Sequence, residues 1–258
     1  MTMKLVSWNV NSIRVREARL LRLLEAERPD VVCLQELKVT NEVFPFEALR
    51  EAGYHAAVHG QKTYNGVAIV SRLEPEEVER GFGDDEDDAQ ARLVAARIGS
   101  VHVACVYVPN GAEVGSEKWA YKLGWMKRLR AWLDRRFAST DPVALCGDFN
   151  VAPEDCDVHD PEAWEGSVLT HPDARKALQD VRGFGLVDSF RLHHEDPGFF
   201  SWWDYRMLGF PKNRGLRIDH VDLSAPLAKQ CRGASIDRNE RKGKQPSDHV
   251  PVIADLDV

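Results

Sequence analysis

The feature that most constrains the fold is a series of short apolar runs, each as long as a β-strand, that alternate with helical patterns along the chain. The run at residues 31–35 is continuously apolar, which is typical of a strand buried on both faces. Further strands are expected at residues 4–8, 54–58, 66–70, 93–98, 101–108, 142–146, 218–223 and 250–256, with a tight hairpin turn at Gly99 and Ser100. Many strands with few helices predict an α/β (α+β) chain in which two packed sheets carry helices on the outside.

Helical spacing is found in three segments, at residues 15–28, 118–137 and 173–182. The first segment is amphipathic, with apolar residues on one face and arginines off it (Ala18, Leu21 and Leu24 against Arg16, Arg19 and Arg22). Pro29 ends this helix, because proline cannot continue the helical hydrogen bonds. The long second segment carries Trp125, Leu129 and Trp132 at helical spacing, which predicts a face packed on the core.

The charge balance is acidic, with a formal net charge of −7. A protein that binds nucleic acid is usually basic, so any contact with DNA is expected from a local basic face. The acidic run DDEDD at residues 84–88 is expected to be a solvated loop, because consecutive carboxylates cannot all turn toward one cation.

The cysteine pattern and the apolar runs indicate in which cellular compartment the protein is expected. The chain has 5 cysteines, an odd number without CxxC spacing, and Cys33, Cys105 and Cys146 fall inside expected strands. Buried, reduced thiols are therefore expected. Neither a secretion signal nor a membrane-spanning run is recognised, and the expectation is a cytoplasmic protein without a membrane partner.

Polar residues recur at the ends of the expected strands. They comprise four carboxylates, three amides, a phenol and an imidazole: Asn9, Glu36, Tyr107, Asn110, Asp148, Asn150, Asp219, Asp248 and His249. Each residue taken alone is more often a cap or a solvated turn residue. The set together predicts a polar site assembled on a rigid frame.

The chemistry of this set favours a hard cation. Mg²⁺ and Mn²⁺ prefer carboxylate, amide and water oxygens, whereas zinc would favour Cys and His clusters that the sequence lacks. A P-loop, a dinucleotide-binding fingerprint and a GxSxG elbow are also absent from the sequence. A Mg²⁺ site with one histidine predicts hydrolysis of a phosphoester.

The segment at residues 199–219 interleaves aromatic and basic side chains, namely Trp202, Trp203, Tyr205 and Phe210 with Arg206, Lys212, Arg214 and Arg217. Cations can follow a phosphate backbone while aromatic rings pack on sugars or bases, so the segment favours DNA. Neighbours in a strand point to opposite faces, so one tryptophan at most should face the site, and Trp202 is favoured; both could instead belong to the core. Two more basic groups could meet phosphates or be solvated: Arg238, Arg241, Lys242 and Lys244, and Lys118, Lys122 and Lys127.

With these motifs in place, the chain resembles the exonuclease III branch of the endonuclease/exonuclease/phosphatase superfamily, the class II AP endonucleases of bacterial type. The resemblance runs in order through SWNVNSIR, LQELK, YNGVAI, YVPNG, GDFNVAP, FSWWDYR, NRGLRIDH and SDHVPV. It implies a four-layer α/β sandwich, with two mixed β-sheets face to face and helices outside. It also implies a single domain over residues 1–258.

The resemblance also implies roles at the site. Glu36 would be the main metal ligand, with Asn9 and Asp248 close to the metal and with Asp148, Asn150 and His249 completing its surroundings. Asp148 would activate water or bind a second metal, and Asn150 would hold the phosphate or the water. Asp219 would fix the tautomer of His249, and His249 would contact the scissile phosphate. Tyr107 would donate to the phosphate or protonate the leaving oxygen. Asp148 is the favoured general base, and the His249–Asp219 pair is its rival.

For DNA, the resemblance implies that Trp202, Leu216 and Ile218 wall a pocket for a flipped abasic sugar, whose extrusion costs less because it has no base to unstack. Contacts to the DNA backbone are expected from Asn110, Arg206, Lys212, Arg214 and Arg217. Two departures from relatives stand out. His220 follows the aspartate, where it could lie at the edge of the site, and the loop at residues 112–116 lacks a large wedge.

The function that follows is a Mg²⁺-dependent DNA-repair nuclease, with Mn²⁺ as a substitute. It would hydrolyse the phosphodiester 5′ to abasic sites and would trim 3′ ends as a 3′→5′ exonuclease. Its substrate would be double-stranded DNA with abasic sites or blocked 3′ ends, and it would be a monomer. Alternatives are a non-catalytic nucleic-acid-binding regulator on the same fold, or a phosphoesterase with another substrate, such as a lipid phosphatase or a secreted deoxyribonuclease.

Overall fold

The computed structural model describes residues 2–84, 86 and 89–258, and these residues form two sheets of six strands each. The first sheet has the order β11 (Cys231–Ile236), β12 (Val252–Asp257), β1 (Thr2–Asn9), β2 (Val31–Gln35), β4 (Val67–Ser71) and β3 (His55–His59). The second has the order β5 (Glu76–Arg80), β6 (Leu93–Ile98), β7 (Val101–Tyr107), β8 (Val143–Asp148), β10 (Asp219–Ser224) and β9 (Leu186–Asp188). Both sheets are mixed, because β1 and β2 pair in parallel in one, β7 and β8 do so in the other, and the remaining pairs are antiparallel.

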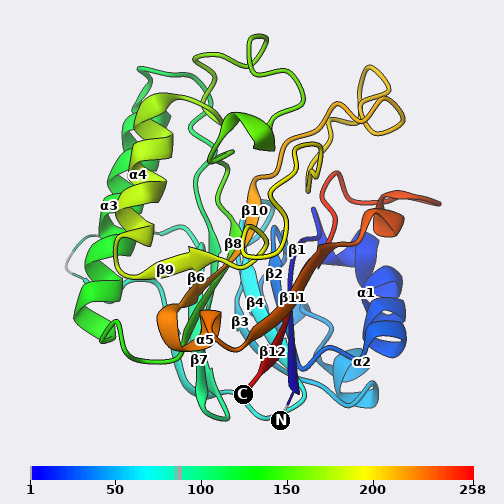
Figure 1. Ribbon diagram of the computed structural model, residues 1–258. Helices are drawn as coiled ribbons and strands as arrows, with labels where there is room; N and C mark the ends of the chain where they lie inside the picture. Colours follow the sequence, from blue (N-terminus) through cyan, green and yellow to red (C-terminus); the bar gives the residue numbers. More distant parts are fainter. Residues whose placement is uncertain (1, 85, 87–88) are drawn as a thin grey trace.

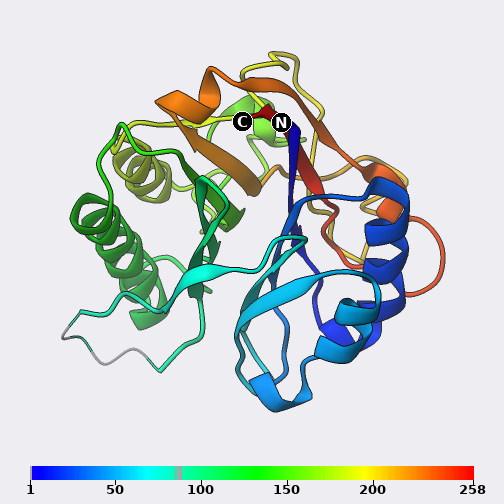
Figure 2. The same cartoon turned by 90° about the horizontal axis from the view of Figure 1, so that it is seen from below.

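The helices cover the outer faces of the two sheets (Figures 1 and 2). The first sheet carries α1 (Ile13–Glu27) and α2 (Phe46–Glu51), and the second carries α3 (Glu117–Arg136) and α4 (Pro172–Arg182). The shorter elements are α5 (Ala225–Ala228) and the 3₁₀ turns η1 (Asn41–Val43), η2 (Asp155–Asp157) and η3 (Arg238–Arg241). The predicted four-layer sandwich is therefore confirmed.

Three apolar clusters hold the layers together. One lies between α3, α4 and the second sheet, one between α1 and the first sheet, and the third lies between the two sheets. The third cluster contains Cys33, Cys105 and Cys146, which are fully buried free thiols, as predicted. That residues 1–258 are a single domain stays a prediction.

Two arginines of α1 correct the predicted pattern. Arg16 and Arg19 are buried, although the helical spacing places them off the apolar face. The Arg19 guanidinium donates to the carbonyl oxygens of Lys242 at 2.6 Å and Lys244 at 2.9 Å. Arg16 likewise donates to the Pro246 carbonyl at 2.7 Å. The two arginines thus anchor the loop before β12, and hydrogen bonds to its backbone make their burial favourable.

The acidic run is partly paired. Asp84 accepts two hydrogen bonds from Arg128, at 2.9 and 2.7 Å, and these outweigh the effect of burial and lower its pKa. Asp84 is therefore part of an ion pair and not simply solvated, and the exposed Glu86 also lies 3.3 Å from Arg128 Nε. Asp85, Asp87 and Asp88 lie outside the described residues. Within the described ranges, no helix combines the length and the apolar character needed to cross a membrane.

Strand register brings the polar strand ends together. Asp148, the last residue of β8, is the register partner of Tyr107 on one side and of Asp219 on the other. Strands β7 and β8 approach so closely at Gly147 that an added Cβ would lie 2.0 Å from the carbonyl oxygen of Val106. Only glycine fits there, so the GDFN motif has a backbone requirement as well as a chemical one.

Candidate active site

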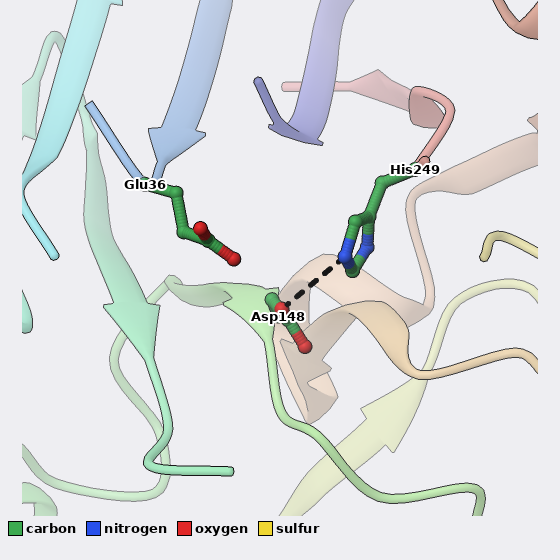
Figure 3. Close-up of side chains that lie close together, drawn as sticks. All are labelled: Glu36, Asp148 and His249. Atoms are coloured by element: carbon green, nitrogen blue, oxygen red, sulfur yellow. Dashed lines mark ion pairs between the residues drawn. The ribbon is translucent and has the colours of Figure 1, made fainter. Parts of the chain in front are cut away.

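Glu36, Asp148 and His249 form a compact group at the ends of the strands (Figure 3). One ligand atom from each of these residues lies within 4.8 Å of the others, and His249 Nε2 lies 3.8 Å from Asp148 Oδ2. Glu36 comes from the end of β2, Asp148 from the end of β8, and His249 from the loop before β12 (Figure 3). Segments more than 100 residues apart therefore supply one site.

Asn9 bridges the two carboxylates of this group. Its Nδ2 donates to Glu36 Oε1 and to Asp148 Oδ2, both at 2.9 Å. Its Oδ1 accepts from the backbone N–H of Asn11 at 3.0 Å. In this arrangement Asn9 fixes the spacing of the two carboxylates, and its predicted place near the metal agrees with that position.

The pKa of Glu36 is lowered, although burial opposes its ionisation. The largest cause that lowers this pKa is the Lys38 ammonium, whose Nζ lies 2.9 Å from Glu36 Oε2. The hydrogen bond from Asn9 lowers it further. Lys38 also donates to Asn11 Oδ1 at 2.5 Å. Sequence reasoning missed both Lys38 and Asn11, although each lies two residues beyond a predicted site residue in LQELK and SWNVN.

Asp248 lies apart from the three-residue group. Its carboxylate accepts from Asn11 Nδ2 at 2.9 Å and from Trp202 Nε1 at 3.1 Å. Burial opposes its ionisation, but His249 and these two hydrogen bonds lower its pKa. Its predicted role at the metal stays a prediction, and in this structure it holds Asn11 and Trp202.

His249 and Asp219 form a buried ion pair. His249 Nδ1 lies 2.9 and 3.1 Å from the two oxygens of Asp219, and Ser201 Oγ donates to Asp219 at 2.6 Å. Burial disfavours the charged imidazole, but Asp219 and then Asp148 outweigh it and raise the pKa of His249 to about 10. An imidazolium with its Nδ1–H on Asp219 turns its Nε2–H toward Asp148, whose Oδ2 lies 3.8 Å away.

The Asp148 carboxyl group has the opposite character. Burial, reinforced by repulsion from Asp219 and opposed by His249, raises its pKa to about 7. The backbone N–H of Asn150 donates to Asp148 Oδ1 at 2.8 Å, which fixes the carboxyl group against the GDFN turn. A group that titrates near neutral pH is suited to accept a proton from water.

Tyr107 and two amides complete the polar floor. The Tyr107 hydroxyl donates to Glu36 Oε1 at 3.0 Å, and burial followed by the charges of Glu36 and Asp148 raises its pKa, so it stays a neutral donor. Asn110 Nδ2 donates to Asn150 Oδ1 at 3.0 Å, and Asn150 Nδ2 donates to the Val108 carbonyl at 2.9 Å. These bonds leave both asparagines in fixed orientations.

The two tryptophans of the 199–219 segment point to opposite sides. Trp203 is fully buried in a cluster with Phe200 and Val250, whereas Trp202 is half-buried and donates to Asp248. Leu216 and Ile218 are buried and pack with Trp202 beside the site. Arg206, Lys212 and Arg214 are exposed and free to meet a phosphate backbone. The DNA-contact roles of these residues stay predictions.

Arg217 was predicted to contact DNA, and this prediction is wrong. Its side chain is 0% exposed, and Nε donates to Asp157 Oδ1 at 2.7 Å while Nη2 lies 2.8 Å from Asp188 Oδ2. His220, expected near the edge of the site, is also 0% exposed; its Nδ1 accepts from Arg217 at 3.0 Å. Burial and the arginines lower the pKa of His220 to about 3, so it is a neutral member of this buried network.

Replacing Arg217 by methionine is therefore expected to affect stability and not DNA binding. It would leave Asp157 and Asp188 as buried carboxylates with less compensation, which costs about 3–5 kcal/mol. The thermal midpoint should fall by on the order of 10 °C, measured by circular dichroism. The control, Arg214→Met, changes an exposed side chain and should leave the midpoint within about 1 °C of wild type. A stable Arg217→Met protein that binds DNA weakly would show instead that Arg217 reaches the DNA.

Two further cations also lie inside the molecule. Lys122 is 0% exposed, so it cannot meet a phosphate from its present position. Arg241 is buried, and its guanidinium lies 4.8 Å from the centre of the Tyr205 ring. Lys118, Lys127, Lys242 and Lys244 are exposed, as solvated or DNA-facing residues would be.

The donor set fits a divalent cation. Glu36 and Asp148 offer carboxylate oxygens, the amide oxygen of Asn150 lies on the neighbouring turn, and His249 lies beside them as an imidazolium. Hard divalent cations favour this oxygen-rich set, and such a cation next to a histidine and a phenol is equipped to act on phosphate esters. Two mixed sheets face to face, with this site at their strand ends, define a divalent-metal-dependent phosphoesterase.

Comparisons with known proteins agree with this class. The model of the endonuclease/exonuclease/phosphatase family matches residues 6–249. The exodeoxyribonuclease III of Haemophilus influenzae is 37% identical, over 98% of this chain and 100% of its own length. The solved AP endonuclease of Archaeoglobus fulgidus superposes with a TM-score of 0.96 at 38% identity, covering 99% of this chain and 100% of that one. A variant of NExo, a 3′ phosphatase from Neisseria solved with product DNA hairpin, has a TM-score of 0.95 at 40% identity and the same coverage.

The chain therefore belongs to the endonuclease/exonuclease/phosphatase family, in its exonuclease III and AP endonuclease branch. The predicted resemblance is confirmed. Members of this branch are phosphodiester-cleaving, metal-dependent nucleases. Membership therefore argues against the alternative of a non-catalytic nucleic-acid-binding regulator.

Proposed function

We propose that the chain is a Mg²⁺-dependent DNA-repair nuclease that incises the phosphodiester 5′ to abasic sites, with additional 3′→5′ exonuclease and 3′-end trimming activity. The observation that carries the proposal is the group of Glu36, Asp148 and His249, with Asp219 paired to His249. It lies in a chain similar over its full length to an exodeoxyribonuclease III and an AP endonuclease.

The cation would be held mainly by Glu36, with Asn9 and Asp248 nearby. A bound Mg²⁺ supplies charge to offset the phosphate and lowers the pKa of a bound water. Mn²⁺ has the same preference for oxygen ligands and is proposed to substitute for it.

The chain's own groups divide the proton chemistry. Asp148, with a pKa of about 7, is proposed as the general base that accepts the proton of the attacking water. His249, with a pKa of about 10, is already protonated at neutral pH and is a poor base, so it is proposed to offset charge on the phosphate. Tyr107 would donate its hydroxyl hydrogen to the phosphate or to the leaving oxygen.

Two amides and an apolar wall would select the substrate. Asn110 and Asn150 would hold phosphate oxygens, and Trp202, backed by the buried Leu216 and Ile218, would accept a sugar that has lost its base. Extrusion of such a nucleotide costs less than extrusion of a stacked one. We propose double-stranded DNA with abasic sites or blocked 3′ ends as substrate, a monomer as the active form, and the cytoplasm as its place.

The exposed cations of the 199–219 segment give a salt prediction. Changing Arg206, Lys212 and Arg214 together to glutamine should make log K for duplex binding less salt-dependent, by up to about 0.9 for each phosphate that the protein no longer neutralises. The measurement is fluorescence anisotropy in EDTA over a range of KCl concentrations. Lys229→Gln, an exposed change just after α5 at the end of β10 away from Asp219, is the control and should leave the slope unchanged. An unchanged slope in the triple variant would place the DNA elsewhere.

The test of the proposed function uses three labelled duplexes: one with a tetrahydrofuran abasic analogue, one intact, and one with a recessed 3′-phosphate end. Mg²⁺-dependent incision at the analogue, faster than degradation of the intact duplex, is the expected result. Dominant removal of the 3′-phosphate would make 3′ trimming the main activity, as the name of the Neisseria relative suggests. No cleavage of any duplex with Mg²⁺ or Mn²⁺ would refute the proposal and favour a phosphoester substrate other than DNA.

A further inference from the structure

Lys122 is a charged side chain completely enclosed by the protein. It lies in α3, flanked by the buried residues Trp119, Trp125 and Met126, and its own exposed fraction is 0%. Burying an ammonium group is costly unless hydrogen bonds compensate for the lost water. Burial lowers the pKa of Lys122 to about 7, with the charge of Asp148 opposing the shift.

The Lys122 ammonium is bound by backbone carbonyls. Its Nζ donates to the carbonyl oxygens of Asn110 at 3.1 Å, Asn150 at 2.7 Å and Val168 at 2.6 Å. These three bonds use all three hydrogens of the ammonium. Among the described residues, no carboxylate lies within ion-pairing distance of it. A methionine of similar volume could fill this space without a desolvation penalty, so what the lysine adds is the link between the carbonyls.

The three carbonyls belong to three different loops. Asn110 follows β7, Asn150 follows β8, and Val168 lies in the turn before α4. Gly111 packs against the lysine stem so closely that an added Cβ would lie 3.0 Å from Lys122 Cδ. One buried cation therefore joins loops that have no continuous strand pairing at this point.

Two of these loops carry groups that face the proposed phosphate site. The side chains of Asn110 and Asn150 are hydrogen-bonded to each other, and the backbone N–H of Asn150 fixes Asp148. A displacement of either turn would move the two amides and the carboxyl group relative to one another. Errors of about 1 Å in such groups can lower a rate by about a hundredfold.

We propose that Lys122 is a positioning residue, which sets the geometry of Asn110, Asn150 and Asp148 by holding their two turns through backbone carbonyls, without touching the substrate. The proposal rests on the proposed nuclease function. It extends that function by making a helix residue on the far side of the second sheet part of the apparatus that orients the phosphate.

The test compares Lys122→Met with Lys229→Met, an exposed lysine just after α5 at the end of β10 away from Asp219, by steady-state incision of the tetrahydrofuran duplex at a temperature where both proteins are fully folded. Lys122→Met is expected to lower kcat by about 10- to 100-fold, with KM changed by less than about threefold. Lys229→Met should match wild type. A loss of thermal stability with unchanged kcat would assign Lys122 a purely structural role and overturn the proposal.

A second readout follows the two amides directly. In ¹H–¹⁵N spectra, the side-chain NH₂ signals of Asn110 and Asn150 should shift or broaden in Lys122→Met and stay in place in Lys229→Met. If Lys122→Met does not fold, Lys122→Gln decides, because its amide keeps two donors and should give a smaller fall in kcat at similar KM. Full kcat in the folded glutamine variant would overturn the proposal. Inactive wild-type protein would instead refute the proposed function, so the two failures are distinguishable.

Discussion

Glu36→Gln is expected to lower kcat for abasic-site incision by roughly a thousandfold, which corresponds to about 4 kcal/mol of transition-state stabilisation. The change keeps the size of the side chain and removes the charge that a cation would meet. It also weakens the ion pair with Lys38, which lies 2.9 Å from Glu36. The fold should persist, because the strand before Glu36 is held by pairing with both β1 and β4.

The measurement is single-turnover incision at saturating enzyme, with Mg²⁺ varied. Glu42→Gln is the matched control, because it makes the same chemical change on an exposed residue six positions along the chain. The control should retain the wild-type rate. If Glu36→Gln also retained it at ordinary Mg²⁺ concentration, Glu36 would not be a ligand of the essential cation.

Asp219→Asn is expected to lower activity by about 10²- to 10⁴-fold near pH 8. Asp219 keeps His249 protonated, since its charge is the largest cause that raises the histidine's pKa to about 10. With a neutral amide in its place, burial dominates and the pKa of His249 falls. The imidazolium then exists only at lower pH, so above pH 7, where the Asp148 carboxylate is ionised and can act as the base, the activity of the variant should fall as pH rises, whereas wild type should keep its imidazolium up to pH 9.

The pH–rate profile of kcat between pH 5.5 and 9 tests this direction of the pH dependence, with Asp204→Asn as an exposed control. A variant that lost activity equally at every pH would show that Asp219 acts on orientation alone. A variant that became more active as pH rose would contradict the role of His249 as a cation and would favour it as the general base.

Most of the frame could be predicted because each buried strand carries its own signal. The run at residues 31–35 is apolar up to Leu34, and the structure gives β2 the same bounds. The polar residues at strand ends could be predicted for the same reason, since Asn9, Tyr107 and Asp148 each end an apolar run. Their mutual distances could not, because these depend on which strands pair and in which register.

The missed strands have weak signals of their own. β5 has the sequence EEVER, which is largely exposed and lies at the edge of its sheet, so it has no apolar face to detect. β9 has three residues, and β11 lies at an edge of the other sheet with a register shift near its start. Such strands form because a neighbouring strand offers unpaired backbone groups, and this information lies outside the segment itself.

The misassigned cations share a physical cause. Arg217 and Lys122 look like surface residues, but their partners come from distant segments: Asp157 and Asp188 for the arginine, and three backbone carbonyls for the lysine. A local sequence pattern cannot show that a charged side chain has a buried partner elsewhere in the chain. Lys38 and Asn11 were closer to detection, because they lie within two residues of Glu36 and Asn9.

Cleavage of DNA 5′ to an abasic position, by metal-dependent hydrolysis at this site, is the central proposal. The most direct measurement is single-turnover incision of the 5′-labelled tetrahydrofuran duplex, with Mg²⁺ titrated from an EDTA-treated start and the product end identified by extension with a DNA polymerase. We expect no incision in EDTA, a saturable rise with Mg²⁺, and a product whose 3′-hydroxyl is extended. Incision at the same rate in EDTA, or a product that cannot be extended, would contradict the proposal.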